Sequence, residues 1–336
     1  MITMTEIAKL TGVSQPTVSR VLNGNQAVNP EIRERVLACA REHNFQPNVI
    51  ARSLAGSRTM LIGLVFTDIS NSFFADLEKY LEQEAKKSGY SVILFNSDYD
   101  WNREKECLDV MRRYRVDGLI LVPVEENSER FQQEMKKLDM PAVAITRKTS
   151  GMDCVYVDHI EAGGQVAHHL QQLGCESYLF VGTKRDGKYE GFLEALKETE
   201  PDCESRLTRI ETKNSEELRR ILKQHFAEHA GRTGIFAYND RRAIQIHGIL
   251  QELGIEMPER ASLVGFDNTY TCEFLYPGLS SVSQPNQEMA AKAVQCLLKK
   301  IEHPEERKIM DEPMQARLIV RGSSAGTYRR SIREKR

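Results

Sequence analysis

The first chemistry that the sequence offers is a group of hydrogen-bonding side chains near the amino terminus. Their spacing places them on one outward face of a short helix. Amide, hydroxyl and guanidinium groups of this kind bind phosphate oxygens and the edges of base pairs. The face therefore predicts a recognition helix that reads duplex DNA. Its members are Gln15, Thr17, Ser19, Arg20 and, at the end of the helix, Asn23.

A helix-turn-helix is predicted to hold this face. Apolar residues recur at helical spacing on both sides of Gly12, which can adopt the positive φ of a tight turn. Ser14 is a favourable N-cap for the second helix, and Pro16 falls in its first turn, where a missing N–H does no harm. The alternative is an ordinary capped αα-hairpin with a solvated polar face.

A third helix is expected to complete the headpiece, residues 1–46, with Asn29 as its cap and Pro30 as its first residue. Residues 1–60 hold seven Lys and Arg against four Glu, a net charge of +3 in a chain whose total is -2. Basic charge thus lies where DNA would bind. Because +3 is modest, we expect two headpieces to share one roughly palindromic operator, and hence a homodimer.

These motifs resemble the lactose-repressor/galactose-repressor (LacI/GalR) family of bacterial transcription regulators. The match is close over residues 17–23, residues 28–33 and the pattern N-x-x-A-R-x-L of residues 48–54, and the resemblance continues to about residue 324. From the helix face and the resemblance together, the predicted DNA-binding residues are Thr3, Met4, Ser14, Gln15, Pro16, Thr17, Ser19, Arg20, Asn23, Asn48, Ala51, Arg52 and Leu54.

Residues 47–59 are expected to form a hinge and linker between two domains. The stretch has too little apolar content for its own core and could fold only on a partner. The resemblance implies that residues 48–56 become a hinge helix on operator DNA, with Leu54 inserted into the minor groove and kinking the duplex. The alternative is that Leu54 packs on the domain that follows.

From residue 60 onward, short apolar runs alternate with amphipathic stretches. This pattern predicts repeated β-α units and parallel sheets covered on both faces. The units recur about four times on each side of residues 158–161, which favours two sheets. We therefore expect an α/β protein in which a three-helix headpiece precedes a two-lobed domain of parallel sheets.

The resemblance implies a periplasmic-binding-protein-like arrangement, in which two lobes clasp a small molecule and the chain crosses between them three times. The effector-binding and dimerisation domain would span residues 60–324. We expect the first lobe at about 60–158 plus 285–312, and the second at about 159–284 plus 313–324. A basic tail, residues 325–336, would follow; it lacks leucine heptads, so dimerisation should use lobe surfaces.

Polar residues follow several of the apolar runs. Ligands of open α/β sheets bind beyond the carboxyl ends of the strands, so these residues are expected to converge on one crevice. Resemblance to effector-contacting positions of the family supports several of them. The alternative for any one of them is a cap on the next helix. The predicted effector-binding residues are Asp68, Asn71, Phe73, Phe74, Asp98, Arg147, Lys184, Lys188, Asn239, Asp240 and Asp267.

Basic residues in this set suggest the chemistry of the effector. Lys184, Arg185 and Lys188 cluster at a helix N-terminus, with Arg147 expected across the crevice, and such a site favours an anion. We hypothesise a sugar, a phosphorylated sugar or a sugar acid; the alternative is that the basic side chains are solvated. The family usually has Arg where Lys188 stands, so a bidentate fork is exchanged for a point charge.

Patterns that could indicate an enzyme are incomplete. Residues 182–189 follow a phosphate-loop pattern until Tyr189, which stands where a Ser or Thr would ligate magnesium. Residues 225–229 spell His-x-x-Glu-His without an obvious third zinc ligand. We expect no catalysis, no cofactor and no metal. A sugar-binding protein, a phosphate-loop nucleotide binder, and an activator or corepressor-dependent regulator remain as alternatives to a repressor.

Two further features bear on location. The sequence has no apolar run near eighteen residues and no signal-peptide pattern after Met1. Its seven cysteines are scattered without a Cys-x-x-Cys pair, which is typical of a reducing compartment. We therefore expect a cytoplasmic, nucleoid-associated protein with no membrane partner.

Overall fold

The computed structural model describes residues 2–22, 27–45, 58–183, 187–199, 201–306 and 308–325. The chain divides into two compact units, Met1–Thr59 and Met60–Arg336. The seven cysteines are free thiols. Within the described ranges, no helix combines the length and the apolar content needed to cross a membrane.

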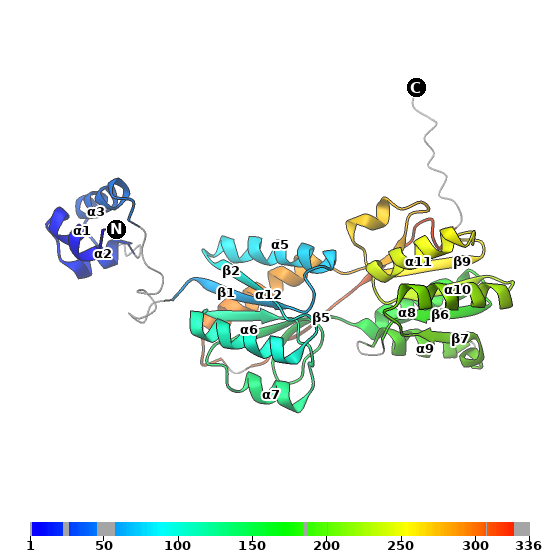
Figure 1. Cartoon of the computed structure of the whole chain (residues 1–336). Coiled ribbons are helices and arrows are strands. Elements are labelled where there is room, and N and C mark those ends of the chain that lie inside the picture. Colours follow the sequence, from blue (N-terminus) through cyan, green and yellow to red (C-terminus); the bar gives the residue numbers. More distant parts are fainter. Residues whose placement is uncertain are drawn as a thin grey trace, which may run out of the picture. The chain divides into compact units, whose positions relative to one another are not determined.

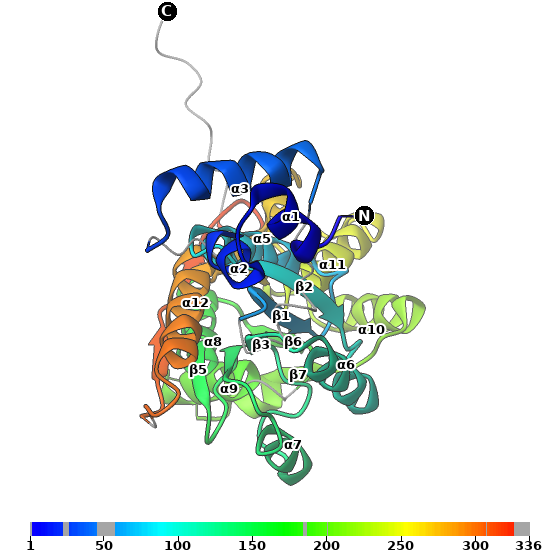
Figure 2. The ribbon, with the colours of Figure 1, turned by 90° about the vertical axis from the view of Figure 1, so that its left-hand side faces the viewer.

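The amino-terminal unit, called the headpiece, contains α1 (Met4–Thr11), α2 (Gln15–Leu22) and α3 (Pro30–Glu42), shown in Figure 2. Thr3 and Glu6 cap α1 reciprocally, and Gly12 ends it at φ 66°. Asn29 caps α3 by accepting a hydrogen bond from the Glu31 N–H at 2.8 Å. The buried side chains of the small shared core are Ile7, Ala8, Val18, Val21, Val36 and Ala40.

The first lobe is a parallel sheet between two helical layers (Figure 1). Helices α5 (Ser72–Lys87) and α12 (Asn286–Glu302) cover one face, and α6 (Trp101–Tyr114) and α7 (Glu129–Met135) cover the other. The strand order is β11-β5-β4-β3-β1-β2. The strands are β1 (Leu61–Phe66), β2 (Ser91–Asn96), β3 (Gly118–Leu121), β4 (Ala142–Thr146), β5 (Asp153–Val157) and β11 (Asp311–Met314).

The second lobe repeats this plan. Helices α8 (His159–Gln172) and α9 (Lys188–Thr199) cover one face of its sheet, and α10 (Ser215–Glu228) and α11 (Asp240–Glu252) the other. The strand order is β12-β10-β9-β8-β6-β7, and only β12 runs antiparallel to its neighbour. The strands are β6 (Ser177–Val181), β7 (Leu207–Ile210), β8 (Thr233–Ala237), β9 (Ala261–Asp267), β10 (Ser280–Ser283) and β12 (Arg317–Ile319).

Three connections join the lobes, from β5 to α8, from β10 to α12 and from β11 to β12. Two single turns of 3₁₀-helix, η1 (Cys203–Arg206) and η2 (Tyr270–Glu273), belong to the second lobe. The predicted fold class, a helix-turn-helix headpiece followed by two parallel-sheet lobes, is confirmed.

A buried carboxyl group links α6 to the loop after β3. Glu104 is fully buried, and its Oε2 accepts a hydrogen bond from the Val124 N–H at 2.7 Å. Its Oε1 has no partner among the described residues. Burial, reinforced by the nearby charges of Glu125 and Glu126, raises the pKa of Glu104 to about 7.

We expect Glu104→Gln to stabilise the protein at pH 8 by about 3 kcal/mol. The folded carboxyl titrates near 7 and the unfolded one near 4.5, so ionisation of Glu104 lowers wild-type stability as pH rises between these values. Glutamine keeps an acceptor for Val124 and carries no charge. Urea unfolding at pH 5 and pH 8 measures the effect. A difference between variant and wild type that does not grow with pH would contradict it.

Candidate functional site

The polar face of α2 points away from the headpiece core. Val18 and Val21 are buried, whereas Gln15 and Arg20 are exposed and make no hydrogen bond or ion pair with other described residues. Both side chains are therefore available to a partner. Thr17 and Ser19 are half-buried on the same helix.

Several other predicted DNA contacts have roles within the headpiece. Ser14 and Thr17 share a hydroxyl–hydroxyl hydrogen bond of 2.8 Å at the start of α2, beside exposed Pro16. Thr3 caps α1, and half-buried Met4 packs against the core. The remaining predicted DNA contacts, and the hinge helix, lie outside the described residues: Asn23, Asn48, Ala51, Arg52 and Leu54.

The two lobes meet over polar side chains at the carboxyl ends of their strands. Arg241, on α11, donates to Asp68 Oδ2 at 3.1 Å and to Ser70 Oγ at 3.0 Å, both in the loop after β1. Asn71 caps α5 by accepting from the Phe73 N–H at 3.2 Å, and it also hydrogen-bonds Asp267. Residues of the first lobe thus contact residues of the second across this cleft.

Asp267 is the most strongly perturbed acid of the cleft. It is buried at the end of β9, with φ 110°, and accepts a hydrogen bond from Gln284 Nε2 at 2.8 Å. Burial raises its pKa to about 8, although the charge of Lys188 opposes the shift. Lys188 is itself buried; its Nζ donates to the Tyr238 carbonyl at 3.1 Å and lies 4.0 Å from the centre of the Phe266 ring.

Asp240 and Asn239 are occupied by contacts within the second lobe. The fully buried Asp240 accepts from Ser281 Oγ at 2.5 Å and from the Thr269 N–H at 2.6 Å. These bonds fix the turn that follows β9. Asn239 accepts from the Arg242 N–H at 2.9 Å, which makes it the N-cap of α11.

The remaining predicted cleft residues differ in exposure. Arg147 pairs with Glu126 at 3.4 Å, and exposed Asp98 pairs with Arg103 at 2.8 Å. Phe73 and Phe74 are buried in the apolar core of the first lobe, with ring centres 5.1 Å apart. Lys184 lies outside the described part of the chain.

Two tyrosines of the cleft were missed by sequence reasoning. Tyr99, after β2, is 45% exposed, and Tyr238, after β8, is half-buried. Desolvation raises the pKa of Tyr99, and the nearby Tyr238 and Asp68 raise it further. Asp98 and Tyr99 both have positive φ, 54° and 56°. This backbone conformation is uncommon for residues other than glycine, so the sequence does not predict where the loop places Tyr99.

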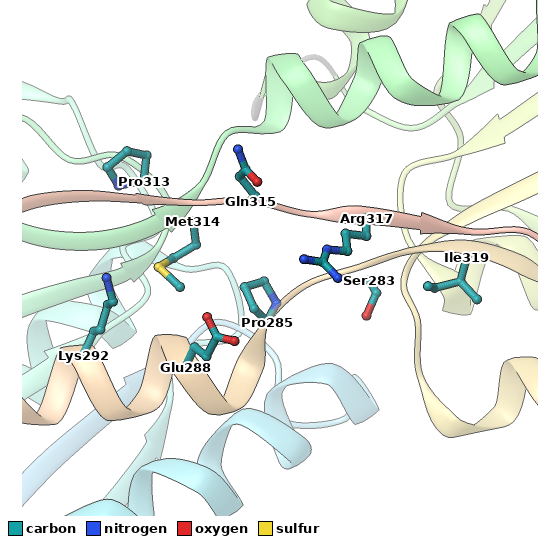
Figure 3. Close-up of a pocket in the computed structure, with 9 residues that line it drawn as sticks. All are labelled: Ser283, Pro285, Glu288, Lys292, Pro313, Met314, Gln315, Arg317 and Ile319. Carbon is teal, nitrogen blue, oxygen red and sulfur yellow. The ribbon is translucent and has the colours of Figure 1, made fainter.

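A second hollow lies beside the connections between the lobes (Figure 3). It measures about 460 Å³ and is bounded by the β10–α12 and β11–β12 segments. Lys292, on one wall, pairs with Glu312. None of the predicted effector residues lines it. The lining residues are Ser283, Pro285, Glu288, Lys292, Pro313, Met314, Gln315, Arg317 and Ile319.

The patterns that could indicate an enzyme have packing roles. His225 Nε2 lies 3.1 Å from Thr233 Oγ1 and 3.3 Å from Ser177 Oγ, and burial lowers the pKa of His225 to about 4. The Tyr189 ring packs edge-on against Phe180. Among the described residues, no group of three or more His, Cys, Asp or Glu is arranged to hold a metal ion.

A headpiece with an available polar helix face, followed by two lobes that meet over polar side chains, defines a ligand-responsive DNA-binding regulator. Comparison with known families agrees. Residues 3–48 match the bacterial regulatory proteins of the lacI family, and residues 167–324 match the periplasmic binding protein-like domain.

Similar proteins cover nearly the whole chain. The HTH-type transcriptional regulator RegA of Clostridium saccharobutylicum is 30% identical over 95% of this chain and 98% of its own length. The ribose operon repressor of Halalkalibacterium halodurans is 31% identical over 97% and 98%. A LacI family transcriptional regulator from Enterococcus faecium, solved with bound ribose, is 27% identical, with a TM-score of 0.69 over 79% of this chain and 98% of that one.

The chain belongs to the lacI family of bacterial regulatory proteins. It is a DNA-binding transcriptional regulator, and its family is one of regulatory proteins rather than of enzymes. The resemblance and the class of protein predicted from the sequence are therefore confirmed.

Proposed function

We propose that this protein is a cytoplasmic, nucleoid-associated repressor that binds a palindromic operator as a homodimer and responds to a small carbohydrate-like effector. The observation that carries the proposal is the exposed face of α2, where Gln15 and Arg20 have no partner among the described residues. The name of the ribose operon repressor and the ribose bound to the Enterococcus protein support a repressor with a sugar effector.

The proposed effector site is the cleft where Asp68, Asn71 and Asp267 approach one another. Tyr99 and Tyr238 add aromatic and hydroxyl surface there, in place of the buried Phe73 and Phe74. Asp240 and Asn239 position the surrounding turns. Ligand contacts to both lobes would favour one relative orientation of the lobes.

The charges of the cleft favour a neutral or donor-rich effector over the phosphorylated sugar that the sequence suggested. Arg147 is paired with Glu126, and Lys188 is directed to the Tyr238 carbonyl, the Phe266 ring and the Asp267 carboxyl. The charge of Arg147 is thus compensated by Glu126, and Lys188 is already engaged by partners within the protein. A phosphate group would have to compete with these internal partners.

In this proposal, DNA binding is controlled by a change in the relative orientation of the lobes. Effector binding alters the orientation of the first lobes in the dimer, which decides whether both hinge segments can order on one operator. By thermodynamic linkage, operator DNA must alter effector affinity by the same factor.

The proposed dimer uses an exposed aromatic surface on the second lobe, formed by Tyr270, Phe274 and Tyr276 at and after η2. Their exposed fractions are 70%, 79% and 87%. Clustered aromatic side chains with this exposure are typical of protein interfaces.

We expect Phe274→Asp to weaken self-association about tenfold or more, because it places a charge in this apolar contact. Sedimentation velocity over a dilution series measures the effect. Tyr114→Asp, at a 61% exposed aromatic on the first lobe, is the matched control and should leave the dimer intact. Equal weakening by the two substitutions would exclude the η2 surface as the interface.

Gln15→Ala tests the reading role of α2. We expect it to weaken binding to the operator by about 1–2 kcal/mol, or 5- to 30-fold, and to leave binding to random-sequence DNA unchanged. Fluorescence anisotropy with both DNAs at one salt concentration makes the comparison. Arg41→Ala, on α3, is the control. Equal losses on both DNAs for Gln15→Ala would refute base reading by this residue.

A further inference from the structure

An ion pair joins the two lobes at a distance from the segments that connect them. Arg241, on α11 of the second lobe, reaches Asp68 and Ser70 in the loop after β1 of the first lobe. We call this contact the Arg241 bridge. In the first sheet, β3 and β4 lie between β1 and β5, the nearest strand that leads into a connection. Three strand spacings are about 14 Å, so the bridge lies well away from the connections about which the lobes can turn.

The first lobe holds its side of the bridge in place. Asp68 Oδ1 accepts from the Ser70 N–H at 3.0 Å and from the Ser70 hydroxyl at 2.6 Å. The Ile69 N–H donates to Asn96 Oδ1 at 3.1 Å. One carboxylate oxygen of Asp68 thus fixes the loop, and Oδ2 accepts from the guanidinium. Because the acceptors are already positioned, little conformational entropy is lost when Arg241 binds them.

On the second lobe, Arg241 differs from its neighbour in the direction of its contacts. Arg242 donates to the Thr212 carbonyl at 2.9 Å and to Gln245 at 2.6 Å, both within its own lobe. Arg241 instead donates to the first lobe, and its side chain is 64% exposed. An exposed side chain adds little to the packing of the second lobe, so the role of Arg241 lies in the contact between the lobes.

We propose that the Arg241 bridge is a latch: it favours the lobe orientation described here without help from an effector, and it thereby sets the affinity for operator DNA. Rotation about the connections separates Arg241 from Asp68, and the bridge opposes that rotation. Arg241 is therefore a positioning residue. The Asp68 side chain is only 19% exposed, so the pair should favour this orientation about fivefold, at the upper end for pairs with one exposed partner. The inference rests on the proposed function, in which lobe orientation controls DNA binding.

Hydrogen–deuterium exchange of the full-length protein tests the latch without DNA or effector. Arg241→Ala removes the cation, and Asp68→Asn removes the anion but keeps an acceptor for Ser70. We expect each to speed amide exchange at least threefold at residues 267–270 and 284–287, which lie away from the bridge. The double variant should exchange no faster than either single one, because both substitutions break one contact. Changes confined to residues 67–71, or additive effects of the two substitutions, would overturn the latch.

Two further variants separate the latch from a general loss of charge. Arg241→Lys keeps a cation that can pair with Asp68 and should restore exchange to within twofold of the wild type. Arg219→Ala is the matched control, since Arg219 pairs with Glu252 inside the second lobe and is also on its surface. It should leave exchange at both segments unchanged. Equal effects of Arg219→Ala and Arg241→Ala would refute the role assigned to the bridge.

Operator affinity is measured on the same variants without effector. We expect Arg241→Ala and Asp68→Asn to change it at least threefold, in the same direction, and Arg219→Ala to leave it unchanged. Sequence-specific binding that Arg241→Ala alters less than 1.5-fold would refute only the latch. A wild-type protein without sequence preference would refute the proposed regulatory function, and the exchange measurement would still decide whether the bridge holds the lobes.

Discussion

Replacing Gly191 by alanine is expected to prevent the second lobe from folding. Gly191 lies on α9 where this helix crosses α8, and an added Cβ would overlap the Ile160 carbonyl group. At the same crossing, Gly163 lies on α8, and a Cβ added to it would overlap the Lys188 carbonyl of α9. Because backbone meets backbone at two points, the helices can make room only by separating.

The expected cost is about 5 kcal/mol or more, which equals the whole stability of many domains. Soluble yield and urea unfolding measure it. Gly164→Ala is the matched control: its Cβ would meet the Ala195 Cβ at 3.6 Å, an ordinary contact, so we expect a change within about 1 kcal/mol. A Gly191→Ala protein that unfolds like the wild type would show that α8 and α9 are not packed as described.

Val18→Asp is expected to reduce operator affinity at least 100-fold while the thermal unfolding of the lobes stays unchanged. Val18 is fully buried in the headpiece core, and an unpaired carboxylate there costs several kcal/mol. A three-helix unit of this size has only a small free energy of unfolding, so a loss of several kcal/mol would unfold it. Because residues Met1–Thr59 form a separate compact unit, the damage should stay within the headpiece.

Fluorescence anisotropy with operator DNA and calorimetry of the lobes provide the two measurements. Leu10→Asp adds the same charge at a 61% exposed position of α1 and serves as the control, for which we expect a much smaller loss of affinity. Equal losses from the two substitutions would indicate a general charge effect and contradict the role assigned to the headpiece core.

The headpiece and the central strands could be predicted because their signals are local. Gly12, Asn29 and Pro30 mark turns and caps within a few residues of the helices they bound. Long apolar runs such as Leu61–Phe66 specify a strand buried on both faces.

The strands β7, β10, β11 and β12 have no clear signal in the sequence, because each is a run of only three or four residues with no long apolar stretch. Asp311–Met314 contains two acids and a proline, which is tolerated at the edge of a sheet. Ser280–Ser283 becomes a strand because β9 and β12 pair with it from both sides. Such pairing between distant segments leaves no periodic signal in the sequence.

The candidate site was predictable in position but not in detail. The carboxyl-end rule located Asp267 and Asn71, which do lie together. It could not show that Asp240 would face Ser281, or that Lys188 would reach the Tyr238 carbonyl, because these choices depend on partners that folding brings close. Gln284, which donates to Asp267, was overlooked because it follows a strand that has no clear sequence signal.

The most direct measurement is selection of genomic DNA fragments by the immobilised full-length protein, with sequencing of the bound fraction. It is carried out at moderate salt, with and without each member of a panel of sugars. The account predicts enriched fragments that share one inverted repeat, are less enriched with Gln15→Ala, and change in recovery with at least one ligand. Fragments recovered no better than random competitor DNA under every ligand condition would contradict it.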